Sequence, residues 1–432
     1  MAATATLLLA CTGAQADKVK LEVDVGTPVL LAGHSQTAYL KVGLTGFPIG
    51  AHEKRTPINV AIVLDRSGSM SGEKIRKAKE AALMAVDQLG PEDIVSVVSY
   101  NHTVDVLVPA TKVRNRGQIH RRIDKLFASG NTALFAGVSK GAYEVRKFLD
   151  RNRINRVILL SDGLANVGPS SSSELASLGW SMAKEGISVT TIGLGHDYNE
   201  DLMFSLARNS DGNHAYAANA TDLARIFSYE FGDLLSVVAR EVHVTIRCAP
   251  GIRPVLVLGR HAEINGDTVV ARLNQIYAEQ EKFLLLEVQI PASPRGSTRE
   301  LATVDISYAN PVSNTTDMLG ATALVRFSES MAAVDANRNE SVMVASVELI
   351  ANYANKQALD LRDQGRVAEA ERALEDNAVY LDSAAKKYKS KKLKKRAGAN
   401  RDDKANLAPA RWKKQRKIMR DNQYEADMQQ AW

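Results

Sequence analysis

The chain reads Ile58-Asn-Val-Ala-Ile-Val-Leu64 and then, without a break, Asp65-Arg66-Ser67-Gly68-Ser69. The first of these segments is almost entirely apolar and rich in β-branched residues, which is typical of a strand buried on both faces of a parallel sheet. The second places one carboxylate and two hydroxyls directly after that strand. Apolar residues with helical spacing follow over 73–89, so the sequence predicts a strand, a polar loop and a helix.

The same alternation continues as far as residue 238. Strands that alternate with helices indicate βαβ units on a mostly parallel, doubly wound sheet. We therefore expect a Rossmann-like α/β domain over residues 56–238. Its further strands are expected at 93–100, 104–108, 157–160, 187–194 and 214–217, and its further helices at 115–127, 136–149, 173–184, 200–208 and 222–238.

Strand patterns flank this domain on both sides. Residues 18–45 contain two or three alternating segments, and six short strands separated by turn residues are expected between 242 and 327. Together they predict one β-sandwich, assembled from residues 17–55 and 239–330. From residue 331 the pattern turns helical, and two amphipathic segments that meet at Gly365 predict a helical hairpin within 331–390.

The charge of the chain is unevenly distributed. The 432 residues carry a formal charge of +6, yet residues 386–420 alone hold sixteen Lys or Arg and two Asp, a net charge of +14. Residues 1–385 are mildly acidic, with a net charge of −5. We interpret 391–432 as a basic, flexible tail, with contact to an anionic surface through 386–420 as the alternative. Specific nucleic-acid binding is not expected, because the run lacks a platform of aromatic residues.

The N-terminus has the pattern of an export signal. A short apolar core at 7–10 precedes Ala14-Gln15-Ala16, whose small residues suit cleavage after Ala16, so residues 1–16 are expected to be a signal peptide. Leu8-Leu9-Ala10-Cys11 is an imperfect lipoprotein box, which makes a lipid anchor at Cys11 the alternative. Both predict a periplasmic or cell-envelope protein. Because residues 1–6 hold no Lys or Arg, a leader without a targeting role is the other interpretation.

Two more polar segments follow later elements of the α/β domain. Gly130-Asn131-Thr132 places a hydroxyl before one helix, and Ser161-Asp162-Gly163 places a second carboxylate after the strand at 157–160. Ligands of doubly wound sheets bind at the carboxyl ends of the strands, and such oxygen donors suit a hard divalent cation. Two carboxylates and three hydroxyls would hold Mg²⁺ without saturating it, so the ion would accept a carboxylate from a partner protein. The five candidate residues are Asp65, Ser67, Ser69, Thr132 and Asp162.

This order of segments resembles the von Willebrand factor A domain and its metal-ion-dependent adhesion site, over about residues 56–238. The resemblance implies that Ser67, Ser69 and Thr132 are direct ligands of Mg²⁺, with Mn²⁺ or Ca²⁺ as alternatives. It further implies that Asp65 and Asp162 act through water or as alternative ligands. Many relatives have a second Gly where this chain has Asn131. The wider layout is similar to bacterial exported A-domain proteins and, distantly, to the heavy chains of inter-alpha-trypsin inhibitor.

The resemblance implies a non-enzymatic adhesion or interaction module whose partner presents Asp or Glu. The second hypothesis is an intracellular assembly factor that acts with a partner ATPase. An enzymatic interpretation rests on Ser71-Gly-Glu-Lys74, an S-x-x-K motif, but its companion K-T-G is absent from the sequence, and Lys74 is expected to be solvated. The scattered histidines, His102, His120, His196 and His214, are expected to be ordinary loop or surface residues.

Overall fold

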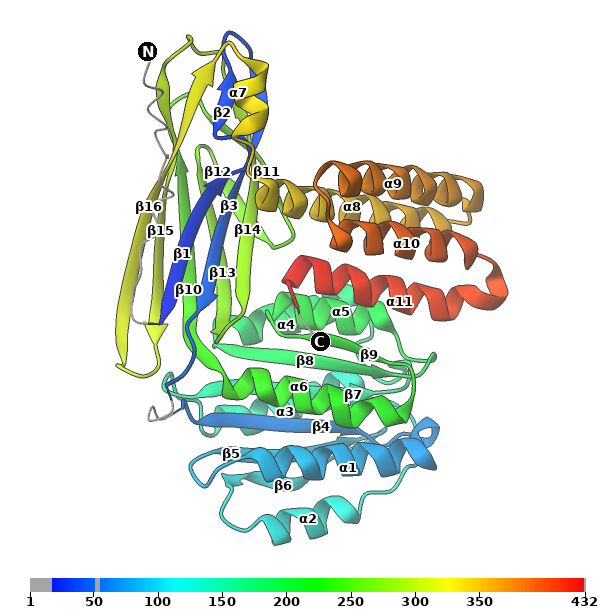
Figure 1. The fold of residues 1–432 in the computed structure, drawn as a ribbon. Helices are drawn as coiled ribbons and strands as arrows, with labels where there is room; N and C mark the ends of the chain where they lie inside the picture. The colour runs from blue at the N-terminus through cyan, green and yellow to red at the C-terminus, as the bar shows by residue number, and fades with distance from the viewer. Residues whose placement is uncertain (1–17, 51–54, 431–432) are drawn as a thin grey trace.

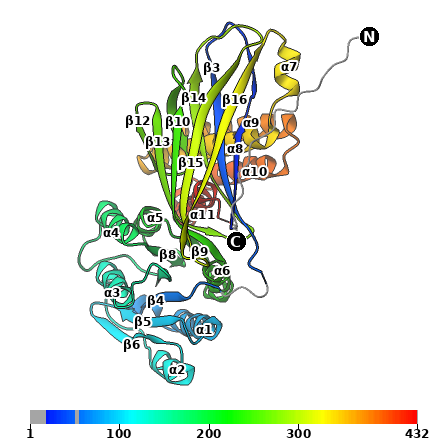
Figure 2. The same cartoon turned by 90° about the vertical axis from the view of Figure 1, so that its left-hand side faces the viewer.

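The computed structural model describes residues 18–50 and 55–430, which form an α/β domain, a β-sandwich and a bundle of helices (Figure 1). Figure 2 shows the α/β domain at one end of the elongated sandwich. The predicted leader and Cys11 lie outside the described residues. Among the residues described, every helix is too short or too polar to cross a membrane.

The α/β domain is built on a six-stranded sheet in the order β6-β5-β4-β7-β8-β9. The strands run parallel to one another except for β6, which pairs antiparallel with β5 at one edge. All eight residues of the central strand β4 are buried, which explains the continuous apolar run that ends at Asp65. The strands are β4 (Ile58–Asp65), β5 (Ile94–Tyr100), β6 (Val104–Lys112), β7 (Ile154–Ser161), β8 (Ile187–Leu194) and β9 (His214–Ala217).

Helices cover both faces of this sheet, so the predicted doubly wound fold is confirmed. One face packs against α1 (Glu73–Gln88), α2 (Arg116–Asp124) and α6 (Leu223–Leu235). The other face packs against α3 (Leu134–Arg146), α4 (Ser172–Lys184) and α5 (Glu200–Asn209). The helix expected at 222–238 ends earlier, because Val237 already begins a strand of the sandwich.

The β-sandwich consists of two sheets that share one apolar core. Strand β14 pairs antiparallel with β3, so segments from both sides of the α/β domain complete the same sheet, as the sequence predicted. The first sheet holds β1 (Val19–Val25), β3 (Gln36–Gly46), β14 (Glu281–Ile290) and β11 (Arg253–Leu258). The second holds β12 (Ala262–Asn265), β13 (Thr268–Tyr277), β10 (Val237–Cys248), β15 (Thr298–Asn310), β16 (Thr315–Ser328) and β2 (Val29–Leu31).

The C-terminal region is more extensive than the predicted hairpin. Residues 391–428, expected to belong to a flexible tail, form two helices that pack on the hairpin and on the α/β domain. The expectation was wrong because half of the buried positions of these helices are polar: α10 buries Asn400 and Asp403, and α11 buries Gln415 and Lys417. The helices are α7 (Met331–Ala336), α8 (Glu340–Asp363), α9 (Val367–Lys387), α10 (Lys391–Ala405) and α11 (Pro409–Met428).

Ion pairs hold α10 and α11 in place. The guanidinium of Arg416 contacts three carboxylates, those of Glu200, Asp201 and Asp363, at 2.5, 2.6 and 2.8 Å. Eight of the sixteen Lys and Arg side chains of 386–420 thus form ion pairs with carboxylates that lie earlier in the chain. Further pairs of this kind are Arg396–Glu348, Arg401–Asp382, Lys404–Glu375, Lys413–Asp197, Lys417–Glu200 and Arg420–Asp201.

Helix α11 also covers the open edge of the α/β sheet at β9. The amide side chain of Gln430 exchanges two hydrogen bonds with the backbone of His214, at 3.2 and 2.9 Å. The carboxylate of Asp421 accepts a bond of 3.1 Å from the backbone N–H of Tyr216, and the Tyr424 hydroxyl donates to the carbonyl of Gly212 at 2.7 Å. Side chains thus satisfy backbone groups that another strand would otherwise pair with.

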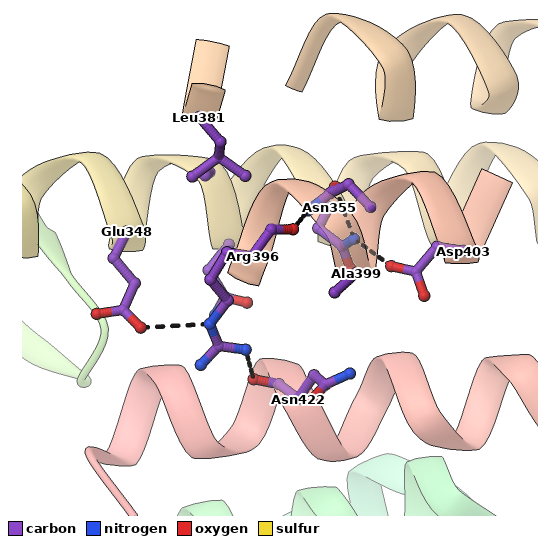
Figure 3. Close-up of a pocket in the computed structure, with 10 residues that line it drawn as sticks. Glu348, Asn355, Leu381, Arg396, Ala399, Asp403 and Asn422 are labelled. Atoms are coloured by element: carbon purple, nitrogen blue, oxygen red, sulfur yellow. Dashed lines mark hydrogen bonds and ion pairs between the residues drawn. The ribbon is translucent and has the colours of Figure 1, made fainter. Parts of the chain in front are cut away.

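The bundle of α8 to α11 has a polar interior around a cavity of about 20 Å³, which has room for a single water molecule. Figure 3 shows Arg396 between Glu348 and the backbone carbonyl of Asn422, and Asn355 beside Asp403. Burial raises the pKa of Asp403 to about 6. The cavity is too small for an organic ligand.

Candidate metal centre

Three polar segments meet at the carboxyl ends of β4 and β7. Because these neighbouring strands run parallel, with Leu64 opposite Leu160, the carboxylates of Asp65 and Asp162 reach the same edge of the sheet. The loop after β4 is tied to the segment before α3: the N–H of Gly68 donates to the carbonyl of Gly130 at 2.9 Å. The structure thus brings together the five residues that the sequence singled out.

Asp65 anchors the loop that follows it. One carboxylate oxygen accepts the backbone N–H of Ser67 at 2.8 Å, and the other accepts the hydroxyls of Ser161 at 2.7 Å and Tyr100 at 3.4 Å. Asp65 is completely buried, and this burial raises the pKa of its carboxyl, while the hydrogen bonds from Ser161 and Ser67 oppose the shift. Every hydrogen-bond donor to Asp65 is a neutral group. The Asp65 carboxylate therefore positions the loop and supplies negative charge.

The three hydroxyls converge beside Gly163. A Cβ atom placed on Gly163 would lie 3.1 Å from the Thr132 hydroxyl oxygen, 3.5 Å from that of Ser69 and 3.8 Å from that of Ser67. The Ser67 and Ser69 oxygens are 3.0 Å apart, and Ser69 donates to Oδ1 of Asp162 at 2.7 Å. The missing side chain of Gly163 therefore leaves a small space that three hydroxyl oxygens face.

This donor set fits a hard divalent cation. Ser67, Ser69 and Thr132 would hold Mg²⁺ directly, and the buried carboxylates of Asp65 and Asp162 would supply the balancing charge. Within 18–50 and 55–430, no group of three or more His, Cys, Asp or Glu side chains could hold a metal. The described part of the chain therefore offers this hydroxyl-rich centre in place of a zinc-type site.

Lys74 also belongs to the site, although the sequence pattern did not indicate it. Its ammonium group forms an ion pair with Oδ2 of Asp162, and its side chain is 31% exposed, so the prediction of a solvated Lys74 was wrong. Ser71 does not pair with it: the Ser71 hydroxyl closes a turn by donating to the Gly68 carbonyl at 2.8 Å. The position of Lys74 in the first helical turn after the loop was the feature of the sequence that could have indicated its place in the site.

Other supporting residues were also overlooked. Asn166 accepts the backbone N–H of Thr132 at 2.9 Å and so fixes the third hydroxyl-bearing segment. The ring of His102 lies so close to Gly130 that a Cβ there would be 2.2 Å from Nδ1, which explains the glycine at this position.

Away from the metal centre, His214 was expected at the surface or in a loop. It is completely buried, and its Nδ1 lies 2.8 Å from the Thr191 hydroxyl.

Comparisons with known proteins agree with the geometry. The family model described as "von Willebrand factor type A domain" matches residues 59–228, a range that contains all five candidate residues. The uncharacterized protein sll0103 of Synechocystis sp. (strain ATCC 27184 / PCC 6803 / Kazusa) is 28% identical over 278 residues, which cover 62% of this chain and 65% of that protein. Human inter-alpha-trypsin inhibitor heavy chain H2 is 31% identical over 165 residues, covering 36% and 17% of the two chains.

Among solved structures, the von Willebrand factor type A protein from Catenulispora acidiphila superposes with a TM-score of 0.71 at 17% identity, and the match covers 88% of this chain and 91% of that one. At this identity the similarity concerns the fold alone. The chain spans less than two thirds of the length of the curated relatives it matches.

Proposed function

We propose that the chain is a non-enzymatic, metal-dependent protein-interaction module, on the basis of the match of residues 59–228 to the family model described as "von Willebrand factor type A domain". Domains of this family commonly mediate contacts between proteins. The proposal adds that Mg²⁺ at the centre described above binds an Asp or Glu side chain of the partner. Mn²⁺ or Ca²⁺ are the alternative ions.

One observation carries this proposal: three hydroxyl oxygens face the space beside Gly163, with two buried carboxylates behind them. Neutral oxygens neutralise none of the charge of a divalent cation, and the Asp65 and Asp162 oxygens already accept hydrogen bonds from Ser67, Ser161 and Ser69. A cation held there would keep a strong attraction for an external anion. A carboxylate from a partner protein supplies that anion.

Calorimetric titration with Mg²⁺ tests the metal. The Asp65→Ala variant is expected to lose Mg²⁺ binding, because the buried charge and the anchor of the loop disappear together. Asp105→Ala is the matched control, since Asp105 is an exposed carboxylate that pairs with Arg66 of the same loop. Equal Mg²⁺ affinity in wild type and Asp65→Ala would contradict the proposal. Capture of partners with and without EDTA then tests whether the interaction depends on the ion.

The cellular location is a separate part of the proposal. We place the protein in the periplasm or cell envelope, on the basis of the leader pattern at 1–16, with a lipid anchor at Cys11 as the alternative to cleavage after Ala16. Mass spectrometry of the N-terminus of the cellular protein distinguishes these states. An intact Met1 or Ala2 would instead favour the second candidate, an intracellular assembly factor that acts with a partner ATPase.

Contact with an anionic surface forms a subsidiary proposal. The residues concerned are the exposed lysines around the turn between α9 and α10, which we call the lysine corner. Within the described chain, Lys392 alone of this group has an ion-pair partner, Glu348 at 2.7 Å. Most Lys and Arg side chains of α11, by contrast, form ion pairs within the chain. We therefore assign the contact with an anionic surface to the lysine corner. Its members are Lys386, Lys387, Lys389, Lys391, Lys392, Lys394 and Lys395.

A further inference from the structure

The two carboxylates of the metal centre are compensated in different ways. Asp65 receives hydrogen bonds from neutral groups, whereas Asp162 carries the ammonium group of Lys74 on Oδ2 and the hydroxyl of Ser69 on Oδ1. Asp162 is completely buried, so its pairing with Lys74 is weakly screened by solvent. One of the two negative charges that would hold a cation is therefore already neutralised by this chain itself.

Local structure explains how Lys74 reaches this position. Gly72 has a φ of +77°, and this left-handed residue lets α1 begin directly after the loop, so that Lys74 falls in the first turn of the helix. Gly195 lies on the other side of Lys74: a Cβ there would be 3.8 Å from the Nζ atom, an ordinary van der Waals distance. A cation in the first turn is disfavoured by the helix dipole, which suggests that its pairing with Asp162 has a purpose other than helix stability.

We infer that Lys74 is a resident counter-ion of Asp162, which lowers the affinity of the centre for divalent cations. This inference rests on the proposed function. A divalent ion beside the three hydroxyls would lie close to a fixed positive charge that shares a carboxylate with it, and like charges at such a distance repel. Lys74 thus sets how much Mg²⁺ is needed to fill the site, and it leaves a bound ion less neutralised and more attractive to an acidic ligand.

Other roles of Lys74 lead to different expectations. If the ion pair only stabilised the fold, replacing Lys74 would change the melting temperature without changing Mg²⁺ affinity. If Lys74 only positioned Asp162 for the metal, its replacement would weaken Mg²⁺ binding. A counter-ion that opposes the cation predicts the contrary: the affinity for Mg²⁺ rises when the charge is removed.

The experiment is a calorimetric Mg²⁺ titration of wild type, Lys74→Gln, Lys74→Arg and Lys77→Gln. Lys74→Gln is expected to bind at least tenfold more tightly and to gain a larger Mg²⁺-induced rise in melting temperature. Lys74→Arg keeps the charge and is expected to match wild type. Lys77 lies on the same helix but pairs with Glu80, so Lys77→Gln controls for general charge. Unchanged or weaker binding by Lys74→Gln overturns the inference.

The outcomes also separate this inference from the proposed function. If wild type binds Mg²⁺ and Lys74→Gln binds equally well, the metal site stands and the role of Lys74 fails. If Lys74→Gln binds Mg²⁺ and wild type does not, the counter-ion stands and the metal-dependent function fails. If neither protein binds Mg²⁺, both are overturned. The double variant Lys74→Gln, Asp65→Ala is expected to lose the tighter Mg²⁺ binding of Lys74→Gln. That loss would assign the tighter binding to this metal centre.

Discussion

The guanidinium group of Arg156 lies 3.1 Å from the carboxylate of Glu230, and both side chains are completely buried. Arg156 comes from β7 and Glu230 from α6, and the same guanidinium donates to Gln275 and Tyr277 of β13 at 2.6 and 2.7 Å. This ion pair therefore lies where the α/β domain meets the sandwich, and the hydrogen bonds of Arg156 connect the two.

Removing one member of this pair is expected to be costly. Arg156→Ala leaves the Glu230 charge buried without its partner, and we expect a loss of about 3–5 kcal/mol in the free energy of unfolding, measured with urea. The double variant Arg156→Met, Glu230→Gln is expected to recover part of this loss. Arg76→Ala, which breaks an exposed pair with Glu80, should cost about 0–1 kcal/mol. If Arg156→Ala lowered the free energy of unfolding by no more than Arg76→Ala does, the buried pair would contribute little to stability.

The space beside Gly163 offers a steric test of the metal centre. Gly163→Ala places a methyl group 3.1 Å from the Thr132 hydroxyl oxygen, at the position that a cation would share. Loss of Mg²⁺ binding is expected by calorimetry, with a change in stability below about 1 kcal/mol. Gly232→Ala on α6 is the control, because a Cβ there meets nothing within 4 Å. Normal Mg²⁺ binding by Gly163→Ala would place the ion elsewhere.

His214 predicts a loss of stability in acid. Burial lowers the pKa of its ring to about 4, from 6.5, so the folded protein keeps the ring neutral at pH 5 whereas the unfolded chain protonates it. This contribution to stability is complete above pH 6.5 and is lost as the pH falls towards 4. Wild type is expected to lose about 2 kcal/mol more than His214→Gln between pH 7 and 5. Parallel pH profiles of the two proteins in urea unfolding would contradict this assignment.

The lysine corner predicts binding to anionic lipid surfaces. Substitution of four of its lysines by Gln, at Lys386, Lys387, Lys391 and Lys394, is expected to weaken cosedimentation with phosphatidylserine vesicles at least about 100-fold, since each lysine near such a surface contributes about 1 kcal/mol. The control removes four exposed cations around α2: Arg114, Arg121, Arg122 and Lys125. Equal losses in the two variants would indicate an effect of overall charge.

The sequence was sufficient for the parts of the fold that rely on apolar patterns. The continuous run before Asp65 predicted the buried central strand, and the order of polar loops after successive strands predicted which residues would meet at one edge. Parallel strands bring their carboxyl ends together whatever the connecting helices are, so this prediction required no knowledge of contacts.

The parts that could not be predicted depend on long polar side chains. Helices α10 and α11 bury amides and cations such as Asn400 and Lys417, and a pattern of apolar residues does not mark such faces. Lys74 was misjudged for a related reason: its flexible stem carries the charge to Asp162, which lies far away in the sequence. Which acid a lysine meets is decided by the tertiary fold.

The hydrogen bonds between α11 and β9 have a consequence for the order in which the protein matures. Gln430 lies 216 positions after His214 in the chain, so a ribosome releases the strand long before the helix that covers it. Until α11 is made, the nascent α/β domain exposes an unpaired strand edge, to which another strand could add. A chain that stops before Pro409 would keep that edge open, which makes incomplete synthesis a route to self-association and to recognition by chaperones.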